Sequence, residues 1–224
     1  MEKDTKLKRR IGSLDKGSYR YITRKKKEYI LKVLLCTFIG LAIYVLGLCL
    51  NRFQSDNLFT LIAILMVLPG AKALVALAVF WPFRSVSEDR GQKVLNVLAK
   101  NYPDLPPETS FRRLPHIIEG KLSVYLDMVF TSSEKVMNLD VLVITSTRML
   151  GLVGKQKQNL TYLNAHLQDS MVKRGLAFGV KVYEKEEDFI KALKELRPDS
   201  PEMEEKNKQD RKSVIEFIEV LIVR

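Results

Sequence analysis

Three residues in the second half of the chain have side chains that could do chemistry together: Asp127, Asp140 and Lys155. Asp127 and Asp140 lie within, or at the start of, two neighbouring predicted strands, and Lys155 follows a third short apolar segment. As a set they fit an enzyme that acts on a nucleotide or a nucleic acid. An acid near a strand start is more often a satisfied edge or turn residue, so a structural role is the alternative for each.

The order of predicted elements over residues 87–183 resembles the core of the restriction-endonuclease-like nucleases: helix, three strands, helix, strand. In that family an Asp on one strand and a Glu-x-Lys on the next bind a divalent metal ion. The resemblance implies that Asp127 or Asp140 stands for the first acid and that Lys155 stands for the lysine. Residues 147–154 supply no Glu-x-Lys, so it implies an incomplete or degenerate active site.

No other catalytic or metal-binding motif is complete in the sequence. The stretch 151–156 (GLVGKQ) lacks both the four-residue spacing between glycines and the Ser/Thr of a phosphate-binding loop. His116 and His166 have no His or Cys neighbour at ligand spacing. Cys36 and Cys49 both lie in an apolar segment, so the rest of the chain can form no disulfide or thiolate site. The sequence therefore predicts no metal site and no cofactor.

The elements that must position these residues follow a long apolar region, residues 29–83. Two apolar segments, about 29–50 and 58–81, are separated by the short polar break 51–57. Each segment is long enough, at about 1.5 Å per residue, to cross a hydrocarbon layer of about 30 Å. The sequence therefore predicts a transmembrane helical hairpin.

Charge is distributed unevenly around this hairpin. Residues 1–28 hold eleven Lys/Arg and four Asp/Glu, whereas residues 84–224 hold 23 and 21. Because positive flanks stay on the cytoplasmic side, both termini are predicted in the cytoplasm and the 51–57 break outside. The basic cluster Arg24, Lys25, Lys26 and Lys27 is predicted to contact anionic lipid headgroups. The near-neutral domain argues against a nucleic-acid partner, because such domains carry a basic face.

The second apolar segment contains a proline and a lysine. Pro69 lacks the N–H that would continue the helix, so a kink is predicted there. Lys72 lies nine residues before Trp81, about 13 Å along a helix. It could reach cytosolic water, meet a carbonyl freed by Pro69, contact a partner, or serve transport or sensing. In the first segment Gly40 and Gly47 share one helical face, which predicts close packing on the second helix.

Residues 84–224 are predicted to form one domain after a basic tail (1–28) and the hairpin (29–83). The acidic run 184–188 is interpreted as a solvated helix start, and residues 214–223 fit either a helix or a strand. The fold class predicted is a membrane-anchored α/β or α+β protein with a mixed sheet flanked by helices. The predicted elements are helix 87–100, strands 123–131, 136–146 and 149–153, helix 160–174, strand 178–183 and helix 186–196.

We expect a bacterial-type protein of the cell membrane whose cytoplasmic domain binds or scaffolds a protein partner or a second copy of the chain. The alternative is a membrane-tethered enzyme of nuclease-like or nucleotide-acting type. The absence of a complete catalytic motif favours the binding module.

Overall fold

The computed structural model describes residues 16–52, 57–102, 116–118, 122–132, 135–154, 158–176, 178–198 and 200–222. The chain forms two compact units. One consists of residues 23–82, which we call the hairpin. The other consists of residues 1–22 together with 83–224, which we call the domain. The segment 16–22, predicted as part of a basic tail, therefore belongs to the domain.

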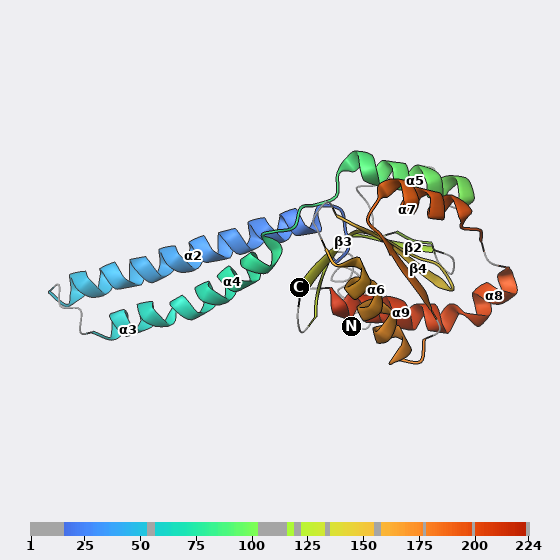
Figure 1. Cartoon of the computed structure of the whole chain (residues 1–224). Coiled ribbons are helices and arrows are strands. Elements are labelled where there is room, and N and C mark those ends of the chain that lie inside the picture. Colours follow the sequence, from blue (N-terminus) through green and yellow to red (C-terminus); the bar gives the residue numbers. More distant parts are fainter. Residues whose placement is uncertain are drawn as a thin grey trace, which may run out of the picture. The chain divides into compact units, whose positions relative to one another are not determined.

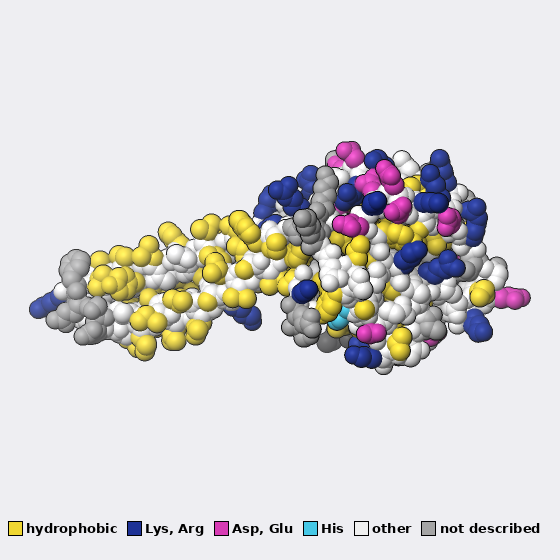
Figure 2. Space-filling view, viewed as in Figure 1, with side chains coloured by type: hydrophobic (Ala, Val, Ile, Leu, Met, Phe, Trp, Pro, Cys, Tyr) yellow, Lys and Arg dark blue, Asp and Glu magenta, His cyan; other side chains and the backbone are white. Residues whose placement is uncertain are grey.

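The hairpin consists of α2 (Tyr21–Leu50), which begins in the last residues of the domain, α3 (Leu58–Leu65) and α4 (Val67–Phe80). The helices Tyr21–Leu50 and Leu58–Phe80 are long and apolar enough to cross a membrane. Only 6 % of the most apolar stretch of each helix is buried. Figure 2 shows hydrophobic side chains covering the surface of this part of the chain. These helices do not have the buried apolar surface of a core helix in a soluble protein.

Glycines on α2 bring the two arms of the hairpin together, as the sequence predicts. A Cβ at Gly47 would lie 2.5 Å from Cβ of Phe59, and one at Gly40 would lie 3.5 Å from Cβ of Met66. Asn57 caps α3, because its Oδ1 accepts the N–H of Thr60 at 2.9 Å. The second arm is interrupted between α3 and α4.

The interruption lies at Met66, three residues before Pro69. A proline has no N–H to donate to the carbonyl four residues earlier, and its ring crowds that carbonyl. The helical pattern therefore breaks in the turn that precedes Pro69, where the sequence predicts a kink.

The domain contains a five-stranded sheet in the order β1-β2-β3-β4-β5. The first four strands are antiparallel neighbours, and β5 runs parallel to β4 after the crossover helix α6 (Leu160–Val172). The sheet is therefore mixed, as predicted. The strands are β1 (His116–Ile118), β2 (Leu122–Thr131), β3 (Val136–Ile144), β4 (Arg148–Val153) and β5 (Gly179–Tyr183).

Helices cover both faces of this sheet (Figure 1). On one face lie α5 (Glu88–Asn101) and α7 (Glu186–Glu195), and on the other lie α6 and α9 (Lys208–Leu221), which follows the short α8 (Pro201–Lys206). The core under α5 and α7 is built from aliphatic side chains of β2, β3 and β4. Leu98, Leu126, Val141, Val143, Leu152, Phe189 and Leu193 are members of this core.

β1 pairs with residues 122–124 of β2. Segments from near both ends of the chain contact the rest of β2. Residues 16–22, which we call the N-terminal strap, lie against it: the carbonyl of Gly17 accepts the N–H of Leu126 at 2.7 Å. Gly17 adopts φ +68°, and a Cβ there would lie 2.6 Å from the ring of Tyr125. Near the other end of the chain, Ile222 forms an antiparallel bridge with Phe130. The sheet edge is completed by residues far apart in sequence.

The predicted helices and strands between residues 87 and 196 are confirmed with small changes in their ends. The C-terminal stretch, left open between helix and strand, is helix up to Leu221, and only Ile222 pairs with a strand. Strand β1 was not predicted. The loop predicted at 102–107 lies outside the described residues after Tyr102.

Candidate functional site

Asp127 and Asp140 occupy facing positions on adjacent antiparallel strands. On either side of them, Leu126 pairs with Val141 and Met128 pairs with Leu139. Both acids interrupt their strands: Asp127 has φ +49°, and the register between β3 and β4 shifts between residues 139 and 141. The structure thus brings together two of the three predicted site residues. Lys155 lies outside the described residues.

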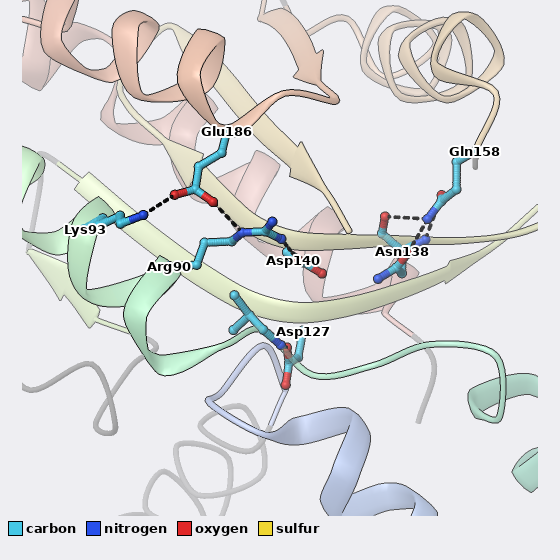
Figure 3. A network of polar contacts seen from close by, with 8 residues as sticks. Arg90, Lys93, Asp127, Asn138, Asp140, Gln158 and Glu186 are labelled. Carbon is cyan, nitrogen blue, oxygen red and sulfur yellow. Dashed lines mark hydrogen bonds and ion pairs between the residues drawn. The ribbon is translucent and has the colours of Figure 1, made fainter. Parts of the chain in front are cut away.

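Asp140 is paired with an arginine from α5 (Figure 3). Its Oδ2 accepts a hydrogen bond from Nη1 of Arg90 at 2.5 Å. The same guanidinium donates from Nε to Oε2 of Glu186 at 2.9 Å, and Lys93 contacts Oε1 of Glu186 at 3.1 Å. One arginine therefore joins β3 to the start of α7.

Burial and pairing act in opposite directions on these carboxyl groups. Burial raises the pKa of Asp140, and the charge and hydrogen bond of Arg90 offset only part of that rise. Partial burial also raises the pKa of Glu186, but the hydrogen bonds from Arg90 and Lys93 outweigh it and leave that pKa below its ordinary value. The positive charge of Arg90 is shared between two acids.

Asp127 is fully buried and has no cationic partner among the described residues. Its Oδ1 accepts the N–H of Val86 at 2.7 Å, and its Oδ2 is buried without a hydrogen-bond partner. Burial raises the pKa of Asp127 to about 7; hydrogen bonds from the backbone N–H of Val86, the side chain of Ser85 and the backbone of Ile22 oppose this rise, and the negative charge of Asp140 adds to it.

Gly154, the residue after β4, lies against Asp140: a Cβ there would lie 2.7 Å from Oδ1 of Asp140 and 3.2 Å from Nδ2 of Asn138. Gln158 pairs with the backbone of Asn138 on β3. Its side-chain amide accepts the N–H of Asn138 and donates to the carbonyl of the same residue. Val153 stands where a Glu-x-Lys ending at Lys155 would have its Glu, so this part of the chain supplies no second carboxylate.

These contacts limit what the site can do. Among the described residues, no group of three His, Cys, Asp or Glu side chains could hold a metal ion. A cation binding to Asp140 would have to displace Arg90, and one binding to Asp127 would have to displace a proton near neutral pH. The arrangement is suited to joining β2, β3, α5 and α7 rather than to binding a metal.

The sequence analysis did not predict three charged residues of the ion-pair network around Asp140: Arg90, Lys93 and Glu186. Arg90 and Lys93 are three residues apart and so lie on one face of α5. Glu186 belongs to the acidic run interpreted as a solvated helix start, yet it binds both cations. The spacing of the two cations is visible in the sequence, but their acidic partners lie 50 and 93 residues away.

The predicted lipid-contact residues lie in the first turns of α2. Arg24 and Lys27 are exposed, and Lys25 and Lys26 are half-buried. Lys72 is exposed on α4 and forms no hydrogen bond or ion pair with a described residue. These positions belong to the hairpin, and the acid pair belongs to the domain.

Comparison of the chain with protein-family models, with curated proteins and with solved structures finds no match in any of the three. The fold and the site geometry therefore carry the functional argument alone.

Proposed function

We propose that this protein is a membrane-anchored binding module, in which a two-helix transmembrane hairpin tethers a cytoplasmic α/β domain that binds a protein partner. The observation that carries the proposal is the division of the chain. An exposed apolar hairpin is inserted between residues 22 and 83 of one compact domain.

The exposure of the hairpin supports insertion into a bilayer. Leu31, Leu34 and Phe38 are 65 %, 62 % and 72 % exposed, and further large apolar side chains are exposed along both arms. An apolar surface of this extent is unfavourable in water and favourable in hydrocarbon. Both arms are long enough for one crossing each.

The domain supports an even number of crossings. The N-terminal strap precedes the hairpin, and residues 83–86 follow it, and both belong to the same compact unit. This favours an arrangement in which both ends of the hairpin lie on the same side of the membrane. The basic residues before the hairpin favour the cytoplasmic side.

The internal pairing of the acids supports binding over catalysis. Arg90 occupies the carboxylate of Asp140, and Asp127 holds a proton to about pH 7. Functional acids for metal-dependent hydrolysis need free, ionised oxygens. The alternative, a membrane-tethered nuclease-like enzyme, draws on the same two acids and is the competing outcome of the tests below.

Cysteine labelling of intact cells tests the topology. A Ser55→Cys variant in a Cys36→Ser, Cys49→Ser background should react with a membrane-impermeant maleimide from outside. As a control in the same background, Glu195→Cys in the domain should react only after lysis. Labelling of position 55 only after lysis would contradict the proposed orientation.

Two measurements test the binding function on the full chain. Photocrosslinking from exposed positions of the domain in intact cells should give an adduct of one defined mass, with twice the chain mass indicating a second copy. The purified full chain with Mg²⁺ or Mn²⁺ should leave single-stranded and duplex DNA uncut. Metal-dependent cleavage that disappears in Asp140→Asn would overturn the binding module in favour of the enzyme.

A further inference from the structure

The first three turns of α2 carry more positive charge than the hairpin neutralises. Residues 23–32 contain five Lys/Arg side chains and one acid, Glu28. The first turn of α2 contains no acidic residue. The start of a helix is itself the positive end of its dipole, so cations there repel both one another and the helix end. Such a cluster favours the binding of anions.

The single acid of this cluster is already shared. Glu28 accepts Lys25 at 2.9 Å on Oε2 and Lys32 at 2.6 Å on Oε1. One carboxylate therefore serves two lysines. Lys27 is exposed and forms no ion pair or hydrogen bond with a described residue. Glu28 therefore does not neutralise all five cations of residues 23–32.

The end of the second arm lies beside these cations. Nζ of Lys26 donates to the carbonyl oxygen of Trp81 at 2.8 Å and lies 5.9 Å from the centre of its ring. The last turn of α4 contains no basic residue, so Lys26 supplies the cation that its terminal carbonyls favour. This contact brings Trp81 next to the basic cluster.

Aromatic rings occur at the same level as the cations. Tyr29 stacks on Phe80 across the two arms at 5.9 Å, and Lys25 and Lys32 lie over the Tyr29 ring at 6.0 and 5.3 Å. Trp81 is 62 % exposed. Tyr and Trp with an apolar body and a polar tip locate at the membrane–water interface. The cations therefore lie at headgroup depth when the apolar arms lie in hydrocarbon.

We infer that Arg24, Lys25, Lys27 and Lys32, together with Tyr29 and Trp81, form a binding surface for the headgroups of anionic phospholipids. The inference rests on the proposed insertion of the hairpin and adds a class of ligand to it. The lipid phosphates supply the negative charge that Glu28 alone does not, and Lys26 holds the two arms together beneath them.

The chain provides its own probe, because Trp81 is its only tryptophan. The full chain is reconstituted in vesicles of phosphatidylcholine and phosphatidylglycerol, with bromine on the acyl chains of one lipid or the other. Brominated phosphatidylglycerol should quench Trp81 more strongly than brominated phosphatidylcholine at the same mole fraction. The selectivity should decrease at high salt, because exposed charges are screened.

Variants identify the side chains responsible. In Lys25→Gln/Lys27→Gln, the local enrichment of the anionic lipid should fall by about fivefold for each cation removed. Lys72→Gln removes a lysine from the same hairpin, about 13 Å along the helix from Trp81. It should retain the wild-type selectivity for the anionic lipid. Lys26 is left unchanged because it joins the two arms.

The outcomes separate this inference from the proposed function. Quenching by neither lipid would show that the hairpin is not in the bilayer and would overturn the membrane anchor. Equal quenching by both lipids in the wild type would overturn the anionic-lipid surface and leave the anchor intact. An equal loss of selectivity in the double variant and in Lys72→Gln would also overturn it, because the effect would then follow total charge.

Discussion

The hairpin and the domain both contain long apolar segments, but they place these side chains in opposite environments. In α2, Leu31 and Phe38 are 65 % and 72 % exposed, whereas in β3 Val141 and Val143 are fully buried. The domain buries apolar groups between its sheet and its helices, and the hairpin leaves them exposed. Charged groups show the same division, because Asp127 and Asp140 are buried in the domain and the hairpin cations are mostly exposed.

This contrast predicts that charge changes damage the domain most. Arg90→Ala would leave Asp140 buried without its cation, which is expected to cost about 3–5 kcal/mol in the free energy of unfolding. Chemical denaturation of the full chain, followed by circular dichroism, measures the loss.

Lys93→Ala is the matched control for this change. Lys93 lies on the same face of α5 as Arg90, and both cations pair with Glu186. The side chain of Lys93 is 66 % exposed, so the expected cost is below about 1 kcal/mol. Equal costs for the two variants would show that Arg90 is not the essential partner of Asp140.

The contact of the N-terminal strap with the sheet should be the next most sensitive feature. In Gly17→Ala the residue would keep a positive φ, and its Cβ would lie only 2.6 Å from the Tyr125 ring. The expected cost in the free energy of unfolding is about 2–4 kcal/mol. Hydrogen exchange at the amide of Leu126, which donates to Gly17, should become faster.

Gly175→Ala separates backbone strain from crowding. Gly175 also has a positive φ, +70°, but a Cβ there would meet nothing within 4 Å. Its cost should therefore be about 1–2 kcal/mol, with no change in exchange at Leu126. If Gly17→Ala behaved in the same way, the strap would not be pressed against β2.

The buried carboxyl of Asp127 predicts a dependence of stability on pH. The folded carboxyl holds its proton up to about pH 7, whereas the ordinary pKa is 3.8. The stability that protonation provides is therefore complete below about pH 4 and is lost as the pH rises through 7. Asp127→Asn keeps an acceptor for the N–H of Val86 and should be more stable than the wild type by about 1–3 kcal/mol at pH 8.

The facing acid gives the control for this prediction. Asp140→Asn makes the same chemical change on the opposite strand but weakens the pairing with Arg90, so it should destabilise the domain at pH 8. Unfolding curves at pH 4, 6 and 8 distinguish the two signs. A gain in stability from both substitutions would show that Arg90 does not compensate Asp140.

The smallest effect is expected where the two arms of the hairpin meet. Gly47→Ala would place its Cβ 2.5 Å from Phe59, and a cost of about 1–2 kcal/mol follows from the forced shift of the helices. Unfolding of the full chain in bicelles, followed by the fluorescence of Trp81, reports on this contact.

Gly40→Ala provides the comparison, because a Cβ there would make ordinary contacts at 3.5 Å. It should be neutral or slightly stabilising, since alanine is the better helix former. If both substitutions were equally tolerated, the close approach at Gly47 would not hold the arms together.

The regular elements between residues 87 and 196 were predictable because their patterns are local. The alternation of apolar residues and the positions of Gly175 and the polar turns locate α5, β2 to β5, α6 and α7 within a few residues. The C-terminal stretch was ambiguous because β-branched residues and a helical spacing occur together. Packing of Val214, Phe217 and Ile218 against the domain accompanies the helix that forms.

The acid site was predicted only in part. Facing positions for Asp127 and Asp140 follow from a hairpin of two strands, but their partners do not. Val86 reaches Asp127 from 41 residues away and Arg90 reaches Asp140 from 50, while Glu186 reaches Arg90 from 96. Such contacts depend on how α5 and α7 lie over the sheet, which no local pattern specifies.

By itself, the sequence determined the apolar hairpin, its basic start and most of the elements of the domain, since each depends on composition or periodicity within a short window. Only the tertiary structure decided that the N-terminal strap joins the sheet, that Arg90 neutralises Asp140 and that Asp127 meets the segment after the hairpin. The strap contact joins residues more than a hundred positions apart. Long-range pairs of this kind arise from the chain topology, which no short window of the sequence specifies.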